Sequence, residues 1–325
     1  MSTESTLPTY DELPVDPNAP PHTAWGLWGE DDNLGTLNLL TPDKVVKATS
    51  LVSRGDVFAL NWKLENPNMG MLNRDACTHI IKPIHGDMVF DDVYDGFNTQ
   101  ASSQWDGLRH FCLSTSGQFY NNTSAEEIKD PKNGKIGVHH MARRGIVGRA
   151  VLLDFARWAE VNVPDYDAFT RYEITVEELD AVAAHQGVTF EEGDILLLRT
   201  GWTARYEVKK AEDTLPVLNA ALGELPDSAG LKFSEDTFRW VWNHHFAAIA
   251  SDNIGVEALP FINPYAGTCH SMFLSGWGMP LGEMFFLEAL AEDCAKDGVY
   301  QFFFSSAPLN KFGGVASPPN ALVIK

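Results

Sequence analysis

Two apolar runs in the middle of the chain carry the clearest structural signal. AVLLDF at 150–155 and ILLLRTGW at 195–202 are almost continuously hydrophobic and follow glycine-containing polar segments. Short continuous apolar runs are typical of strands that are buried on both faces of a sheet. Related patterns predict further strands at 57–64, 246–252, 299–309 and 321–325.

Helical patterns lie between these strands, and several of their ends carry recognisable signals. Thr41 followed by Pro42 begins a predicted helix within 40–52. A Thr-x-x-Glu capping box at Thr175 begins another helix, which ends at Gly187. Further helices are predicted at 236–245, at 270–280 with breaks at Gly276 and Gly278, and at 282–298. This alternation of strands and helices predicts an α/β fold.

The distribution of segments predicts a single domain. Residues 1–23 are rich in Pro, Asp and Thr and are predicted to form an extended N-terminal arm. Residues 66–135 have few periodic segments, with short strands predicted at 78–84 and 111–115, and loops this long are usually functional. Because no linker and no repeat of about 20 to 50 residues divides the chain, 24–325 is predicted to be one domain with long active-site loops.

Composition and charge narrow the classes of partner. The 325 residues are 44% hydrophobic and 21% charged, as in globular proteins, and the net charge is −20. This charge repels phosphate backbones and anionic lipids, so neither nucleic acid nor a membrane is an expected partner. The N-terminus lacks a secretory signal, and no apolar run reaches about 18 residues, so a cytoplasmic location is expected. The four cysteines form no C-x-x-C pair, which argues against a thiolate zinc site.

The segment QASSQWDGLRH at 100–110 concentrates side chains that can hold a cation. Residues two apart in a strand share one face, so Gln104, Asp106 and His110 face the same side if the strand persists. Carboxylates and imidazoles are ordinary ligands of divalent metals, and an amide oxygen is a weaker one. The same pattern is also typical of a hydrogen-bonded polar network, and the spacing alone does not decide between them.

His270 and Glu283 form a second candidate pair. His270 precedes the broken helix, and Glu283 lies at the predicted start of the next helix, so the two side chains can converge on one pocket. The alternative is a Glu283 that stabilises a helix N-terminus and a His270 with an ordinary hydrogen-bonding role.

The remaining histidines and the known catalytic motifs suggest no further site. The adjacent pairs His139-His140 and His244-His245 favour structural roles, because neighbours on a strand point to opposite sides. The sequence contains no G-x-S-x-G elbow, P-loop, G-x-G-x-x-G or H-E-x-x-H motif, so a serine hydrolase or a nucleotide-binding protein has no support.

Taken together, these segments resemble the cyclase family of metal-dependent hydrolases, which includes bacterial kynurenine formamidase and isatin hydrolase. The family signature H-x-G-T-H-x-D-x-P-x-H falls on residues 100–110. Asp106 and His110 match it, whereas Gln100 and Gln104 stand where the family has histidines. Segments similar to blocks of a longer-chain fungal and bacterial branch follow in the expected order at 25–42, 143–154, 193–202, 250–260, 270–290 and 305–324.

The resemblance implies a swivelling β/α/β fold with a mixed sheet or barrel, surrounding helices, and assembly into homodimers or homotetramers. It also implies a metal held by the 100–110 segment together with His270 and Glu283. Because two imidazoles are replaced, Gln104, Asp106, His110 and His270 are predicted to hold a single zinc or manganese ion rather than two. A metal-free site is the alternative.

The predicted function is hydrolysis of an amide, lactone or ester bond in a small cyclic or aromatic metabolite. Glu283 is the predicted general base, Asp106 and His270 act at the ion, and His110 is a ligand or proton carrier. The residues predicted to contact the substrate are Trp28, Trp105, Arg109, Tyr120 and Trp277. Two alternatives remain, namely a metal-independent lyase, cyclase or dehydratase, and a non-catalytic small-molecule binding protein.

Overall fold

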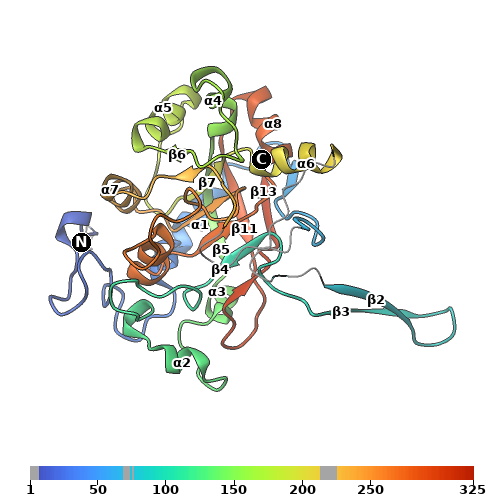
Figure 1. The fold of residues 1–325 in the computed structure, drawn as a ribbon, viewed down its shortest axis with the longest axis horizontal. Helices are drawn as coiled ribbons and strands as arrows, with labels where there is room; N and C mark the ends of the chain where they lie inside the picture. The colour runs from blue at the N-terminus through green and yellow to red at the C-terminus, as the bar shows by residue number, and fades with distance from the viewer. Residues whose placement is uncertain (1–6, 69–73, 75–76, 213–224) are drawn as a thin grey trace.

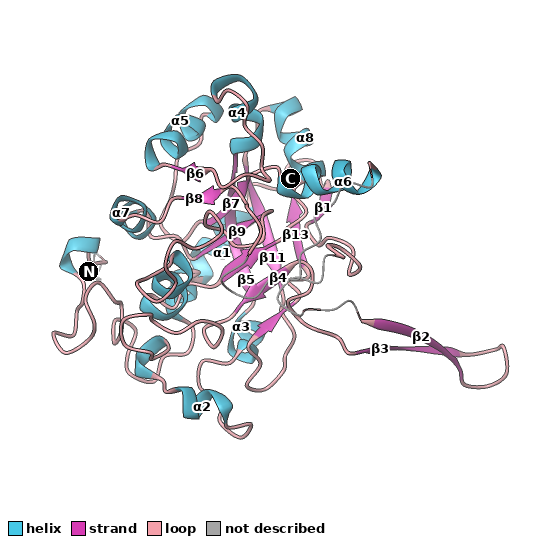
Figure 2. Ribbon diagram, viewed as in Figure 1, coloured by secondary structure: helices cyan, strands magenta, loops and turns pink. Residues whose placement is uncertain are grey.

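A computed structural model describes residues 7–68, 74, 77–212 and 225–325 of the chain. Its centre is a strongly curved, mixed nine-stranded sheet (Figure 1, Figure 2). The strand order across the sheet is β1-β13-β11-β5-β7-β9-β10-β4-β12. The bounds are β1 Val57–Ala59, β4 Gln104–Asp106, β5 Ile146–Asp154, β7 Ile195–Arg199, β9 Ala248–Ser251, β10 Leu281–Glu283, β11 Gln301–Ser306, β12 Ala316–Ser317 and β13 Ala321–Ile324.

The four central strands β5, β7, β9 and β10 run parallel, and their apolar residues divide between two cores. Leu196 and Leu198 lie in one core, while Ile195 and Leu197 lie in the other. Alternate residues of a strand therefore enter opposite layers, which confirms the prediction of strands buried on both faces.

Helices cover both faces of the sheet. Leu179 of α5 and Val241 of α7 belong to the first core, whereas Leu290 of α8 belongs to the second. The α-helices are α1 Pro42–Thr49, α2 Ala125–Lys129, α3 Val138–Arg144, α4 Phe155–Asn162, α5 Val176–Gln186, α6 Trp202–Ala211, α7 Glu235–Asn243 and α8 Glu288–Asp297. The shorter turns are the 3-10 helices η1 Tyr10–Glu12, η2 Gly35–Leu39 and η4 Tyr120–Asn122, and the π-helix η5 Ser271–Gly276. Among the described residues, no helix has the length and apolar character needed to cross a bilayer.

The predicted ends of two helices, α1 and α5, are confirmed by their capping residues. The Thr41 side chain accepts a hydrogen bond from the Lys44 backbone and caps α1. Thr175 and Glu178 form the predicted capping box of α5, and Gly187 ends that helix in the left-handed conformation.

Three local predictions are wrong. The single helix predicted over 282–298 is divided, because Leu281–Glu283 forms β10 and α8 begins only at Glu288. Pairing of β10 with β9 and β4 overrides the local helical pattern. The predicted strand at 111–115 is a loop, and His139 and His140 lie in α3 rather than on a strand.

Two further pairs of strands lie outside the main sheet. Strands β6 (Glu173–Ile174) and β8 (Gly230–Leu231) form a short parallel pair. Strands β2 (Thr78–Pro83) and β3 (Phe90–Asp95) form an antiparallel hairpin that projects from the body (Figure 1). The strand predicted at 78–84 is thus confirmed, although it lies apart from the main sheet.

The N-terminal segment contacts α7. The Trp242 indole donates a hydrogen bond to the Pro8 carbonyl at 2.8 Å, and Arg239 pairs with Asp11 at 2.9 Å. The Tyr10 backbone amide donates to Asn243.

The backbone of β10 lies so close to β9 that only glycine fits at position 282. A Cβ there would lie 2.4 Å from the Ala250 Cβ and 2.7 Å from the Phe285 ring. We expect Gly282→Ala to lower the free energy of unfolding by about 2 kcal/mol, as overpacking does in other cores. Gly148→Ala in β5 is the control, because its Cβ would meet only a Leu40 methyl group at 3.0 Å. Equal thermal midpoints for the two variants would contradict this packing argument.

Candidate active site

Strands β4 and β10 place the first acidic groups of the site. The antiparallel register sets Glu283 opposite Gln104 and Leu281 opposite Asp106. Opposed residues and residues two apart share a face, so Gln104, Asp106 and Glu283 project to the same side. The predicted common face of Gln104 and Asp106 is therefore confirmed, and all three side chains are buried. Glu283 reaches them from a strand and not, as predicted, from the start of a helix.

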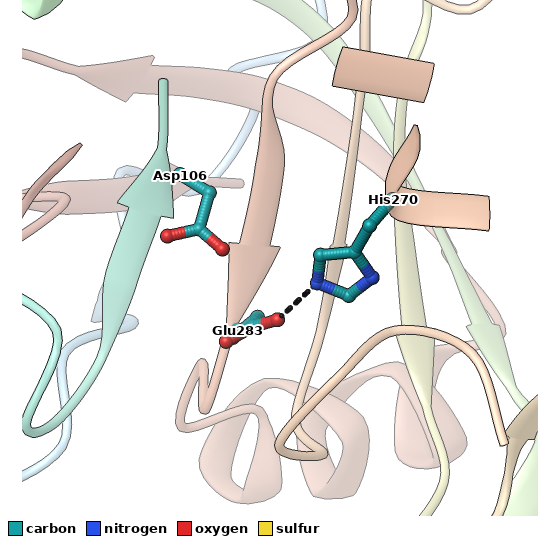
Figure 3. A group of neighbouring side chains, drawn as sticks. All are labelled: Asp106, His270 and Glu283. Atoms are coloured by element: carbon teal, nitrogen blue, oxygen red, sulfur yellow. Dashed lines mark hydrogen bonds and ion pairs between the residues drawn. The ribbon is translucent and has the colours of Figure 1, made fainter. Parts of the chain in front are cut away.

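His270 completes this group from the start of the π-helix η5. Its Nε2 atom lies 2.9 Å from Glu283 Oε1. Figure 3 shows the side chains of Asp106, His270 and Glu283 directed toward one another from three separate segments. Asp106 from the 100–110 segment therefore lies together with His270 and Glu283, as the sequence analysis expected.

Glu257 holds His270 from behind. Its Oε1 atom lies 2.8 Å from His270 Nδ1 and accepts the His270 backbone amide at 2.9 Å, while Oε2 accepts the Cys269 amide at 3.0 Å. The sequence interpretation missed this residue. The available signal was one carboxylate in the apolar stretch IGVEALP, within the segment 250–260 that resembles a family block. A buried acid of this kind needs a partner.

The two carboxylates determine the protonation of His270. Burial disfavours the charged imidazole, but the hydrogen bonds to Glu257 and Glu283 outweigh it and raise the pKa of His270 to about 10. A positive imidazolium thus lies between two acids, and His270 must release its Nε2 proton before that atom can bind a cation.

Burial shifts the pKa values of Asp106 and His110 toward their neutral forms. Burial raises the pKa of Asp106, and the neighbouring His110 only partly offsets this rise. Burial lowers the pKa of His110, so its imidazole is neutral at neutral pH. His110 Nε2 lies 3.5 Å from Asp106 Oδ2. Strand β4 ends at Asp106, and a turn closed by the His110 amide and the Gly107 carbonyl, rather than a continued strand, brings His110 to the site.

The two glutamines contact the carboxylates directly. Gln104 Nε2 donates to Glu283 Oε2 at 2.5 Å and to Asp106 Oδ1 at 3.3 Å. Gln100 Nε2 donates to Asp106 Oδ1 at 2.7 Å and lies 3.2 Å from His110 Nδ1. The amides that replace the family's histidines therefore belong to the same cluster.

The donor set fits one divalent cation. Asp106, His270 and Glu283 each offer a ligand atom, and these atoms lie within 4.8 Å of one another. Two further oxygens, Asp106 Oδ2 and Gln104 Oε1, are buried and accept no hydrogen bond from the described residues. Unsatisfied buried acceptors are costly, and a cation satisfies them. Glu257 would then be the outer carboxylate that orients His270 as a ligand.

A cavity of about 340 Å³ opens beside this cluster. His110, His270 and Glu283 lie in its wall, together with the Arg74 guanidinium. The rest of the wall is mostly apolar and includes Phe111, Phe119, Leu225, Ile254, Leu259 and Phe261. An apolar pocket with a few convergent polar groups is the usual form of a small-molecule site.

Five residues that were predicted to bind substrate lie elsewhere and do not line this cavity. Trp105 points to the opposite face of β4 and donates to Ser306, and Trp277 is in the core, stacked on Phe273. Tyr120 is buried with its hydroxyl on Asp32, and Trp28 packs against both cores. Arg109 donates to the carbonyls of Glu127, Asn133 and Gly313. Arg74, which the sequence interpretation did not single out, is the arginine in the cavity wall.

Fold and site together define an α/β protein built around one large mixed sheet, with a buried carboxylate–imidazole cluster at one edge of an apolar cavity. The chain belongs to the cyclase family, because the family model described as "Putative cyclase" matches residues 39–258. A comparison with functionally curated proteins returns no match.

Solved structures agree with this assignment. The crystal structure of a novel cyclase is 29% identical, with a TM-score of 0.78 over 93% of this chain and 97% of that chain. Isatin hydrolase A from Ralstonia solanacearum is 18% identical, with a TM-score of 0.57 over 82% and 91% of the two chains. Isatin hydrolase A from Labrenzia aggregata, bound to benzyl benzoate, is 16% identical, with a TM-score of 0.55 over 86% and 97%. At these lower identities the two hydrolases show a shared fold.

The donor set makes a prediction about metal content. After incubation with zinc or manganese and dialysis, elemental analysis should find about one ion per chain, since the ligands suffice for one site. Asp106→Asn should abolish retention, and Glu257→Gln should weaken affinity about 10-fold to 100-fold through loss of the carboxylate behind His270. Glu178→Gln, a capping-box variant in α5, is the control. Equal affinity in the Glu257 and Glu178 variants would exclude the role assigned to Glu257.

Proposed function

We propose that this protein is a hydrolase that cleaves an amide, lactone or ester bond in a small, cyclic or aromatic metabolite. One observation carries the proposal: Glu283, His270 and His110 meet at the wall of an apolar cavity, with Asp106 directly behind them. Membership of the cyclase family supports an enzyme, and the lining phenylalanines suit a flat apolar substrate.

Glu283 is the proposed general base. His270 and Gln104 each hold one of its two oxygens, which fixes the carboxylate at the cavity wall. It accepts a proton from the attacking water and returns this proton to the leaving nitrogen or oxygen, so that the carboxylate is restored. The neutral His110 faces the same cavity and can accept a hydrogen bond from that water.

Asp106, His270 and the Gln104 amide oxygen would hold the divalent ion, which leaves Glu283 to act as the base. When bound, such an ion polarises a carbonyl oxygen and lowers the pKa of water. The chain itself contributes the position of these groups and a largely apolar surrounding, in which each electrostatic interaction is stronger than in water.

A metal-independent lyase or cyclase is the second candidate, and the glutamines favour it. Gln100 and Gln104 donate to Asp106 and Glu283, and these bonds stabilise the two acids without an added cation. In this case Glu283 and His110 exchange protons with the substrate directly. Full turnover by a metal-depleted sample would support this candidate and exclude the metal-assisted hydrolase.

The role of Glu283 can be tested by replacement with its isosteric amide. We expect Glu283→Gln to lower kcat about 100-fold or more while KM changes little, because a general base acts in the transition state. A panel of aromatic lactones, amides and esters supplies the assay. Glu288→Gln, five residues along the chain and paired with Arg199, is the matched control. Loss of activity in both variants, or in neither, would contradict the assignment.

Arg74 is predicted to bind an oxygen of the substrate. It is the guanidinium of the cavity wall, and its Nη1 atom also donates to the Gln100 carbonyl at 3.2 Å. We expect Arg74→Met to raise KM about 10-fold for substrates with a second carbonyl or carboxylate group, by loss of a charge-assisted hydrogen bond. Arg205→Met, which removes a surface pair with Asp167, is the control. An unchanged KM in the Arg74 variant would remove this residue from the binding site.

A further inference from the structure

Two residues in a strained backbone conformation lie directly beside the two carboxylates that hold His270. Val256, with a φ of 55°, precedes Glu257, and Met284, with a φ of 52°, follows Glu283. Residues with a side chain seldom adopt this left-handed region, and a β-branched valine is a clear outlier there. Both residues are buried. Such a conformation persists only where surrounding bonds hold it, and it is frequent where a functional group has one required position.

A single asparagine holds both strained residues. Asn253 follows the end of β9, is fully buried, and accepts the Met284 amide through its backbone carbonyl at 2.8 Å. Its side-chain Oδ1 accepts the Val256 amide at 2.7 Å, and its Nδ2 donates to the Ala229 carbonyl at 2.6 Å. Because a backbone amide only donates and a carbonyl only accepts, the side-chain amide has one orientation here. Asn253 is therefore bonded to both segments that carry the carboxylates.

The turn at Val256 is also confined from its other side. The Glu257 amide donates to the Gly255 carbonyl, which closes a three-residue turn of the strained type around Val256. In β8, the Leu231 amide donates to the Val256 carbonyl at 2.9 Å. A Cβ at Gly230 would lie 2.4 Å from the Glu257 carbonyl carbon, so β8 approaches this turn as closely as glycine permits. Because the packing leaves no free space, a change in the backbone angles of the turn must displace Glu257 or β8.

These contacts complete a closed ring of bonds around the candidate site. Glu257, His270 and Glu283 form a row, in which Glu257 Oε1 lies 2.8 Å from His270 Nδ1 and His270 Nε2 lies 2.9 Å from Glu283 Oε1. Asn253 joins the two ends of this row through the residues next to them. It does not itself line the cavity, although its neighbour Ile254 does. Asn253 can therefore influence the site only through other groups.

We propose that Asn253 is a positioning residue, which holds the strained turn at Val256 and thereby sets the spacing of the two carboxylates around His270. The inference rests on the proposed function in one respect, because Glu283 is the base whose position is controlled. An amide that only stabilised the fold would leave the row unchanged in the folded molecules of a variant. A positioning amide would change the row, and relief of the strain at residue 256 would restore it.

The first experiment combines loss of the side-chain amide with relief of the strain. Asn253→Ala leaves the Val256 amide without its acceptor, and we expect kcat to fall about 100-fold with little change in KM, because displacement of a reacting group by about 1 Å costs that much. The double variant Asn253→Ala with Val256→Gly should regain at least about a tenth of the wild-type kcat, because glycine adopts positive φ without strain. Val256→Gly alone is the reference for the lost valine packing. Rates are measured below the thermal midpoint of every variant.

Asn33→Ala is the matched control. Asn33 Oδ1 accepts the Ile136 amide at 2.6 Å, and Ile136 is a β-branched residue with a φ of 51°. The arrangement repeats that of Asn253 and Val256, but neither Asn33 nor Ile136 lines the cavity. We expect the control to lose thermal stability, as Asn253→Ala does, and to keep the wild-type kcat.

The second experiment measures the row itself by nuclear magnetic resonance and does not depend on turnover. In the full chain with isotope-labelled histidine, the buried His270 Nδ1 proton, held by Glu257, should give a low-field resonance protected from exchange with water. His270→Gln identifies this resonance by removing it. We expect the resonance to be shifted or lost in Asn253→Ala, unchanged in Asn33→Ala, and restored in the double variant with Val256→Gly.

The two readouts separate this proposal from the assignment of the reaction. An unchanged resonance in Asn253→Ala, or a double variant that recovers neither the resonance nor kcat, overturns the role of Asn253. If Asn253→Ala does not fold, the double variant decides, because relief of the strain must then return a folded protein with the wild-type resonance. If no substrate of the panel is turned over, the hydrolase assignment fails, and the resonances alone decide on Asn253.

Discussion

Pairing of β4 with β10 is the constraint on which the site depends. These two short strands bring residues 104 and 283 into register although they lie 179 positions apart in the chain. The close approach of β10 to β9, made possible by Gly282, fixes the depth at which Glu283 enters the interior. Gln104, Asp106 and Glu283 therefore belong to the rigid sheet, and rigid elements hold reacting groups more accurately than loops do.

Burial of so many acids is tolerated because each has a specific partner. Glu257, His270 and Glu283 form an alternating row of negative, positive and negative groups. Gln104 donates to Glu283, and Gln100 and Gln104 donate to one oxygen of Asp106. Removing one member of such a row leaves an uncompensated charge in a low-dielectric interior. Stability and chemistry are thus properties of the same side chains.

The sequence predicts the central fold well and the site only in part. Apolar runs identify β5 and β7, and the period of two places Gln104 and Asp106 on one face. Glu283 was expected on a helix, because the local pattern cannot reveal that distant strands will pair with β10. Arg74 and Glu257 carry no motif, and the tryptophans near the motif blocks fill the core, since local sequence does not report which face borders the cavity.

The alternating row of charges also affects how tightly the reaction product is held. Hydrolysis of an amide, lactone or ester converts a neutral carbonyl into an acid, which ionises at neutral pH. That new anion forms at a wall with charges of both signs, because Glu283 repels it whereas the His270 imidazolium and the Arg74 guanidinium attract it. A divalent ion held by the same cluster would add to the attraction. The cavity therefore retains the acid as well as its neutral precursor, and inhibition by the accumulated acid follows.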